Sequence, residues 1–342
     1  MWFFNRLERY FKKTIKYLKL FGINFIFYLL KCIKLIYSCI KEIRSIPKEI
    51  ELVKKDPFIK TWRDNYTENL KLGIFKITTR VDSLEILKKR LSRNIPVILL
   101  ADGPSLDKDI KVIKKMTHNF YIICQDAVLY NCLKNKIKPN LVVSLDPSIL
   151  IKFFWHDLDT SDLILVASST LNPEALKAWK GKILFFNQSD TIRYKNLVLK
   201  KMTWKTRKYP YVQNNGWVGN AMFIISVLLD PSCIILSGYD LAYTHKKYYC
   251  KDYLERRARA LGISKKEVIK YEVKKELKYF DPHTENDYYT SKLFSYYAML
   301  LLSLIKVSHR YVLNSSKSGI LKGLDIINLE ILEKLEIREK IK

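Results

Sequence analysis

The sequence is poor in glycine and lacks the cysteine spacing of metal or redox sites. Glycine occurs 10 times in 342 residues, where average usage of about 7% would give about 24, so collagen-like and low-complexity proteins are excluded. None of the 6 cysteines forms a CxxC pair, so we predict no zinc cluster and interpret Cys124 as a buried thiol. The longest uncharged apolar run covers residues 20–30, about half of what a membrane-spanning helix needs.

The chain is strongly basic. It has 61 Lys and Arg against 34 Asp and Glu, which gives a formal net charge of +27. Arginine supplies only 14 of these cations, although proteins that read phosphates and bases favour its planar, bidentate side chain. We therefore predict no nucleic-acid partner, and we expect attraction to other anionic partners such as membranes, nucleotides or acidic glycans.

The first 60 residues carry 14 cations and 5 acids, a local charge of +9, interleaved with aromatic residues. A basic, aromatic-rich helical segment is typical of binding to an anionic membrane surface, and packing on the rest of the protein is the equal alternative. We expect a cytoplasmic protein whose residues 1–60 hold it on the inner face of the cytoplasmic membrane. The predicted segments that follow are a helical connector (61–94), a catalytic domain (95–325) and an amphipathic C-terminal helix (326–342).

From about residue 95, short apolar runs rich in Val, Ile and Phe alternate with helix-like stretches. This alternation is typical of a parallel sheet with crossover helices. We predict an α/β fold with a Rossmann-like, mostly parallel sheet, preceded by the basic amphipathic helical segment. The predicted strands cover residues 97–101, 120–124, 141–145, 163–167, 183–186, 233–236 and 311–313, and the predicted helices cover 107–115, 127–134, 173–179, 219–229 and 291–307.

Polar residues follow nearly every predicted strand. In an open α/β sheet the ligand binds outside the carboxyl ends of the strands, so these residues predict one cleft for a polar ligand. After the first strand, Gly103 permits a tight turn, Pro104 suits a first helical turn, and Ser105 is a helix cap or a direct donor to an anion. The other predicted contributors after the strands are Asp126, Asp146, Ser168, Asn187, Gly238, Asp240, Asn314 and Ser315, and Gly216 lies beside these segments.

Six sequence blocks occur in the order of one known domain. They are ADGPSL (101–106), ICQDAV (123–128), KPNLVVSLDP (138–147), GWVGNA (216–221), IILSGYDLAY (234–243) and NSSKSGILKG (314–323). Over residues 95–325 the chain resembles the domain shared by Maf-type (motility-associated factor) flagellin glycosyltransferases and archaeal 6-hydroxymethylpterin pyrophosphokinases. This resemblance implies a transferase that uses a nucleotide-activated substrate.

Two reactions follow from the resemblance. The first moves a nonulosonic acid, a sialic-like sugar, from its CMP form onto a hydroxyl of a protein or glycan. The second moves a diphosphate from ATP onto a pterin alcohol. The match of Thr290, Phe294 and Tyr297 to the late aromatic helix of Maf-like proteins favours the sugar reaction. A module that binds a nucleotide or glycan without turnover is the third alternative.

The resemblance gives the polar residues at the predicted cleft roles in holding the donor. Gly103, Ser105 and the first backbone amides of the following helix would hold the donor phosphate. Asn215, Gly216 and Asn220 would bind phosphate or ribose in the same way at another helix.

The remaining roles concern the sugar, the metal and the base. Asp126 and Asp146 would bind ribose hydroxyls, or hold Mg²⁺ if a diphosphate leaving group has to be neutralised. Asp240 and Tyr243 would frame the donor sugar. The acceptor hydroxyl requires a base, for which the imidazoles near the matched segments are available. The predicted catalytic residues are Asp240, His245 and His283.

Overall fold

The computed structural model of the protein describes residues 57–76, 81–84, 87, 95–191, 193–243, 248–272, 277–281, 286–316 and 319–333. The chain divides into two compact units, Met1–Lys55 and Asp56–Lys342. All described residues belong to the second unit. The membrane-binding helices predicted within residues 1–60 therefore lie outside the described residues except for their last four positions.

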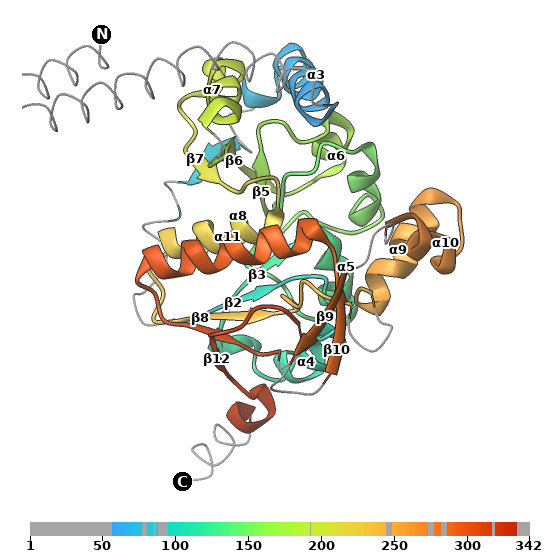
Figure 1. The fold of residues 1–342 in the computed structure, drawn as a ribbon. Helices are drawn as coiled ribbons and strands as arrows, with labels where there is room; N and C mark the ends of the chain where they lie inside the picture. Colours follow the sequence, from blue (N-terminus) through green and yellow to red (C-terminus); the bar gives the residue numbers. More distant parts are fainter. Residues whose placement is uncertain are drawn as a thin grey trace, which may run out of the picture. The chain divides into compact units, whose positions relative to one another are not determined.

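A parallel β-sheet forms the centre of the second unit (Figure 1). Nine strands lie in the order β1-β6-β5-β4-β3-β2-β8-β11-β12, and β7 pairs with the carboxyl end of β6. Every pairing in this sheet is parallel. The strands are β1 (Val81–Ser83), β2 (Val97–Leu100), β3 (Tyr121–Gln125), β4 (Leu141–Ser144), β5 (Ile164–Ser168), β6 (Lys182–Ser189), β7 (Tyr211–Gln213), β8 (Ile234–Ser237), β11 (Val312–Asn314) and β12 (Asp325–Ile326).

Helices connect the strands and cover both faces of the sheet (Figure 1). A separate antiparallel pair is formed by β9 (Leu277–Asp281) and β10 (Asn286–Thr290). The α-helices are α3 (Pro57–Lys71), α4 (Leu106–Ile113), α5 (Leu129–Lys134), α6 (Pro173–Ala178), α7 (Arg193–Met202), α8 (Val218–Leu228), α9 (Lys251–Leu261), α10 (Lys265–Glu272) and α11 (Lys292–Ser308). Short 3₁₀ helices include η1 (Ile74–Lys76), η3 (Thr117–Asn119), η4 (Asp126–Val128), η5 (Ile149–Phe154) and η6 (Trp204–Thr206).

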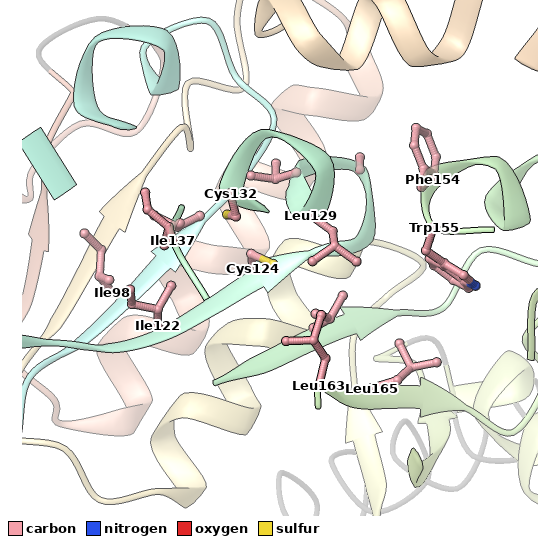
Figure 2. Packing of buried hydrophobic residues seen from close by; sticks show 14 of the residues in the cluster. Ile98, Ile122, Cys124, Leu129, Cys132, Ile137, Phe154, Trp155, Leu163 and Leu165 are labelled. Carbon is pink, nitrogen blue, oxygen red and sulfur yellow. The ribbon is translucent and has the colours of Figure 1, made fainter. Parts of the chain in front are cut away.

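The central strands are apolar except at their carboxyl ends, because each of their faces is buried. In β2, Ile98 and Leu100 pack in a first core cluster, on the face covered by α4, α5 and α6. Val97 and Leu99 pack in a second cluster, on the face covered by α8 and α11. Successive side chains of a strand point to opposite faces, so a strand covered on both sides reads as a continuous apolar run. Figure 2 shows part of the first cluster, where the Cys124 thiol is buried between strand and helix and its pKa is raised by burial.

The direction of the connections reverses at β2. The helix after β2, α4, returns on one face to β3, whereas α8 leads on the other face to β8, and both strands are neighbours of β2. Such a reversal opens a crevice at the carboxyl ends of the strands, which is where ligands bind in open α/β sheets. The predicted fold, a Rossmann-like parallel sheet with crossover helices, is confirmed.

The helix α3 begins before the predicted catalytic domain and is joined to it. Asn65 Nδ2 donates to the carbonyl of Pro147 (2.9 Å), and Asn69 Nδ2 donates to the carbonyl of Leu171 (2.9 Å). At the other end of the chain, residues 329–333 are helical and Leu329 packs into the first core cluster. Among the described helices, none is both long and apolar enough to cross a bilayer.

Candidate functional site

A cavity of about 270 Å³ lies at the carboxyl ends of β2, β3, β4 and β8. Its wall consists of residues that follow these strands, the amino end of α8, and side chains of α3, η5, α9 and α11. The predicted residues in this wall are Gly103, Asp126, Asp146, Gly216 and Gly238. The predicted residues outside the wall are Pro104, Ser105, Ser168, Asn187, Asn215, Asn220, Asp240, Tyr243, Asn314 and Ser315.

One side of the cavity is acidic, with the carboxylates of Asp102, Asp126 and Asp146 in its wall. Asp126 is buried; its Oδ2 accepts the hydroxyl of Ser144 (2.5 Å) and its Oδ1 accepts the backbone N–H of Ala127 (2.7 Å). Burial raises the pKa of Asp126 to about 7, and the charges of Asp146 and Asp102 act in the same direction. This carboxyl therefore changes its protonation near neutral pH, as a general base does.

Asp146 stands beside a cation. Its side chain is accessible to solvent and its Oδ1 accepts the backbone N–H of Ser148 (2.8 Å). The surrounding protein limits hydration and raises the pKa of Asp146, while the Ser148 bond and the Arg257 guanidinium oppose the rise. Arg257, from α9, thus supplies positive charge to a wall that otherwise bears carboxylates.

The amino end of α8 meets the cavity through Gly216, Trp217 and Val218. Gly216 has a φ of 82°, and its N–H donates to Asn214 Oδ1 (2.8 Å), which turns the chain into the helix. No side chain caps this helix. The backbone N–H groups of its first turn are suited to an anion, because the helix dipole adds positive potential there.

Asn215 and Asn220 shape this helix start from behind the cavity wall. Asn215 has a φ of 53°, and its Nδ2 donates to Thr191 Oγ1 (2.6 Å). Asn220 is fully buried and its Nδ2 donates to the carbonyl of Asn214 (3.2 Å). The contacts that we predicted between these two residues and phosphate or ribose remain predictions.

Aromatic rings form another part of the wall. Trp217 stacks on Tyr297, with ring centroids 5.4 Å apart and planes 9° from parallel. Phe294 and Tyr248 line the cavity, and Tyr243 packs behind them with centroid distances of 5.4 Å and 5.0 Å. These faces offer a stacking surface for a planar ring or a sugar. The predicted contact of Tyr243 with the donor sugar stays a prediction.

The turn between β2 and α4 is fastened by a buried carboxylate. Asp240 Oδ2 accepts the N–H (3.0 Å) and the hydroxyl (2.8 Å) of Ser105, and Oδ1 accepts the hydroxyl of Ser316 (2.7 Å). Gly103 is required because a Cβ there would lie 2.3 Å from Asp240 Oδ2 and 2.4 Å from the Gly238 carbonyl oxygen. Asp240 thus joins three loops, and its predicted catalytic role, like the phosphate contact of Ser105, is still a prediction.

Asn314 and Ser315 belong to a neighbouring polar cluster. Ser315 Oγ donates to Asp109 Oδ2, which also accepts the hydroxyl of Ser237 (2.7 Å). Burial raises the pKa of Asp109. Asn314 Oδ1 accepts the N–H of Ser316 (3.1 Å). These bonds hold the ends of β8 and β11 together beside the cavity.

Ser168 and Asn187 form a third polar cluster at the ends of β5 and β6. The Ser168 and Thr170 hydroxyls are 2.7 Å apart. Asn187 Oδ1 accepts the Ser169 hydroxyl (2.7 Å), and its Nδ2 donates to the Thr206 carbonyl (2.9 Å). Ser168 and Asn187 are both fully buried, and these hydrogen bonds join them to other groups of the protein.

Two polar groups in the cavity wall have no partner in the described part of the chain. Gln125 is 2% exposed and its Oε1 is unpaired; Trp62 is 4% exposed and its Nε1 is unpaired. An unpaired buried polar group costs about 1–3 kcal/mol, which a complementary ligand recovers. Sequence reasoning placed Gln125 after a predicted strand but gave it no role, because a missing hydrogen-bond partner has no sequence signal.

The histidines proposed as bases, His245 and His283, lie outside the described residues. Among the residues that the structure describes, no group of three or more His, Cys, Asp or Glu side chains is arranged to hold a metal ion. Asp126 and Asp146 carry the oxygen donors that Mg²⁺ prefers and face one cavity. An ion shared between these two carboxylates and a substrate phosphate is therefore compatible with the side chains present.

A family model described as 6-hydroxymethylpterin diphosphokinase MptE-like matches residues 64–246, more than half of the chain. The chain belongs to this family. The matched region of this MptE-like protein contains β2 to β8 and all three carboxylates of the cavity wall. The domain predicted from the six sequence blocks is thus confirmed.

A solved glycosyltransferase has the same fold. The Maf glycosyltransferase from Magnetospirillum magneticum AMB-1 aligns with a TM-score of 0.51 and 15% sequence identity, over 71% of this chain and 37% of that chain. This MptE-like protein therefore spans less than half of the length of its structural relative. A search of curated proteins found no match. The family description and the structural relative both refer to transferases.

Proposed function

We propose that this MptE-like protein is a transferase that binds a nucleotide-activated donor in the cavity and moves the activated group onto a hydroxyl. The observation that carries this proposal is Asp126, a buried carboxyl in the cavity wall with a pKa of about 7. Attack by a hydroxyl requires removal of its proton, and a base with a pKa near the ambient pH does this efficiently. Asp126 therefore takes the base role that sequence reasoning gave to the histidines.

The donor is held by contacts to its phosphate and its base. The phosphate binds at the amino end of α8 and beside Arg257, which are the positive parts of the cavity wall. The heterocycle lies against Trp217, and its polar edge satisfies Gln125 Oε1 and Trp62 Nε1. In this arrangement the donor supplies the hydrogen bonds that these two buried groups lack within the described part of the chain.

Sugar transfer is the favoured reaction. The acceptor oxygen attacks the anomeric carbon of a CMP-linked nonulosonic acid, the bond from that carbon to the phosphate oxygen breaks, and CMP leaves. The hydroxyl proton passes to Asp126. A leaving group with one phosphate needs little metal assistance, and Phe294 and Tyr297 provide the aromatic helix of the Maf-like pattern. The acceptor is a hydroxyl of a protein or glycan, including lipid-linked glycans.

Diphosphate transfer from ATP to a pterin alcohol is the second candidate, and the acidic wall favours it. Asp102, Asp126 and Asp146 would repel a triphosphate unless a cation stood between them. Mg²⁺ held by Asp126 and Asp146 would supply that neutralisation. The description of the matched family supports this reaction as well.

Calorimetric titration with CMP, CDP and ATP, each with and without Mg²⁺, separates the two reactions. Binding of CMP without metal supports sugar transfer, whereas Mg²⁺-dependent binding of ATP followed by AMP release supports diphosphate transfer. Nucleotide binding with an intact donor after long incubation with cell extract would indicate a binding module. If none of the three nucleotides binds, the proposed function is wrong.

A further inference from the structure

A second charged feature lies on α7 and the turn after it, outside the cavity. Residues 191–229 contain seven Lys and Arg and no Asp or Glu. Five of these cations and two large apolar side chains are exposed along residues 197–208. We name this group the α7 basic surface. It consists of Leu197, Lys200, Lys201, Trp204, Lys205, Arg207 and Lys208.

The α7 basic surface is held rigidly by the other side of the same segment. Leu199, Thr203, Thr206 and Tyr209 are buried at intervals of three or four residues. Thr203 Oγ1 donates to the Leu199 carbonyl (2.8 Å), and Thr206 Oγ1 donates to Tyr66 OH (3.2 Å) on α3. The inward side chains thus fix the segment on the domain, so the cations between them must point outward.

The positive charge of this surface is not neutralised within the described part of the chain, where none of its five cations forms an ion pair. The neighbouring helix α3 pairs its acids with its own cations, Asp64 with Arg63 (3.9 Å) and Glu68 with Lys71 (3.7 Å). Elsewhere exposed lysines do pair, as Lys265 does with Glu255 (2.8 Å). The α7 basic surface is therefore complementary to an extended anionic partner.

The apolar members indicate which kind of anionic partner fits. Trp204 is 62% exposed, and the Arg207 guanidinium lies 3.8 Å from its ring centroid. Leu197 is 48% exposed on the same segment. An indole beside cations is typical of proteins at a membrane–water interface, where the ring lies at the level of the headgroups.

We propose that the α7 basic surface docks this protein on an anionic lipid membrane, with Trp204 and Leu197 inserted among the headgroups. A membrane is favoured over a nucleic acid because four of the five cations are lysines, whose point charges suit a fluid array of lipid phosphates. This inference does not depend on the reaction in the cavity. It also differs from the membrane binding predicted for residues 1–60, because it concerns a rigid part of the catalytic domain.

Vesicle sedimentation of the full-length protein tests the inference. Wild type should bind vesicles that contain phosphatidylglycerol and should not bind pure phosphatidylcholine. Each Lys near an anionic surface changes binding about fivefold, so the triple variant Lys200→Gln, Lys201→Gln, Lys205→Gln should bind on the order of a hundredfold more weakly. On mixing with anionic vesicles, wild type should show a blue shift of tryptophan emission that is smaller in Trp204→Phe.

The matched control removes three exposed lysines from α10: Lys265→Gln, Lys266→Gln and Lys270→Gln. It has the same net charge as the α7 variant, so a much smaller loss of binding is expected. Equal losses in the two triple variants would overturn the inference, because net charge alone would then explain binding. It would also be overturned if wild type ignored anionic vesicles, or bound a DNA fragment and not the vesicles.

Discussion

Asp126 and Asp240 are both buried carboxylates near strand ends, but their surroundings differ. Asp240 accepts three hydrogen bonds from Ser105 and Ser316, which satisfy both of its oxygens within the fold. Asp126 accepts two bonds and faces the cavity. Carboxylates of the first kind hold loops in place, whereas those of the second kind retain a lone pair for a substrate proton.

Asp126→Asn should lower turnover at least a hundredfold, because an amide cannot take the hydroxyl proton. In the wild type, the rate should rise as the pH passes through about 7, where Asp126 loses its proton. A pH–rate profile of donor hydrolysis or transfer checks both statements. Asp109→Asn is the matched control, since Asp109 is also a buried carboxyl with a raised pKa but does not line the cavity.

Asp126→Asn should lower turnover, but it should not lower the stability of the protein above pH 7. A raised folded-state pKa means that the folded protein binds the Asp126 proton more tightly than the unfolded chain, so stability falls as the pH rises from about 4 to about 7. At about 1.4 kcal/mol for each pKa unit, the penalty above pH 7 is on the order of 4 kcal/mol. At pH 8, Asp126→Asn should therefore unfold at a temperature no lower than the wild type.

Asp240→Asn should destabilise the protein by about 2–4 kcal/mol, because an amide group cannot accept from Ser105 and Ser316 on both sides. Urea unfolding at neutral pH measures this change. If Asp240→Asn unfolded like the wild type but lost activity, Asp240 would act on the substrate, as the sequence-based prediction states.

Gln125→Leu should weaken nucleotide binding about tenfold or more without lowering the melting temperature of the free protein. The reason is that Gln125 Oε1 accepts no hydrogen bond from the described residues. Its removal therefore costs a contact with the ligand and none of these internal bonds. Gln188→Leu is the control, because Gln188 also has an unpaired Oε1 but does not line the cavity. Similar affinities in both variants would exclude Gln125 from the binding site.

Among the elements, the central strands were the most predictable. Runs such as Val97–Leu100 and Ile234–Ser237 are apolar because helices cover both faces, and this double burial is visible in the sequence. The edge strands β1 and β7 have three residues each and were not predicted. Short edge strands form because β6 offers them hydrogen bonds, so their own residues carry little signal.

The helix α3 packs on the predicted catalytic domain, and a pair of truncations tests whether that domain needs it to fold. Ile59, Trp62 and Tyr66 of α3 are buried, and burial of three such side chains contributes about 5 kcal/mol or more. A chain that begins at residue 56 should fold and bind nucleotide, whereas one that begins at residue 73 should be unfolded or insoluble. Circular dichroism and ligand titration decide; a folded shorter chain would show that α3 is dispensable.

Across the whole molecule, the sequence predicted that residues after the strands gather at one edge of the sheet. It did not predict which of these residues line the cavity. Residues after strands were expected to converge, and Gly103, Asp126, Asp146, Gly216 and Gly238 do so. Other rim residues bond among themselves instead of facing the cavity. Whether a polar side chain faces a ligand or a neighbour depends on side-chain direction, which strand order does not determine.

Contributors from outside the strand ends were missed. Arg257 comes from α9, Trp62 from α3 and Tyr248 from a loop, and each enters the wall through tertiary packing. Their only sequence signal is that charged and aromatic residues are frequent throughout the chain. Among the described residues, these distant contributions give the cavity wall its cation, Arg257, and part of its aromatic surface.

A crystal structure of the protein grown with CMP, or with ATP and Mg²⁺, tests the central claim most directly. The account predicts a nucleotide in the cavity, with phosphate at the amino end of α8 beside Arg257, the base on Trp217 and in contact with Gln125, and Asp126 open to the acceptor side. A nucleotide bound elsewhere, or an empty cavity at concentrations that saturate binding in solution, would contradict it.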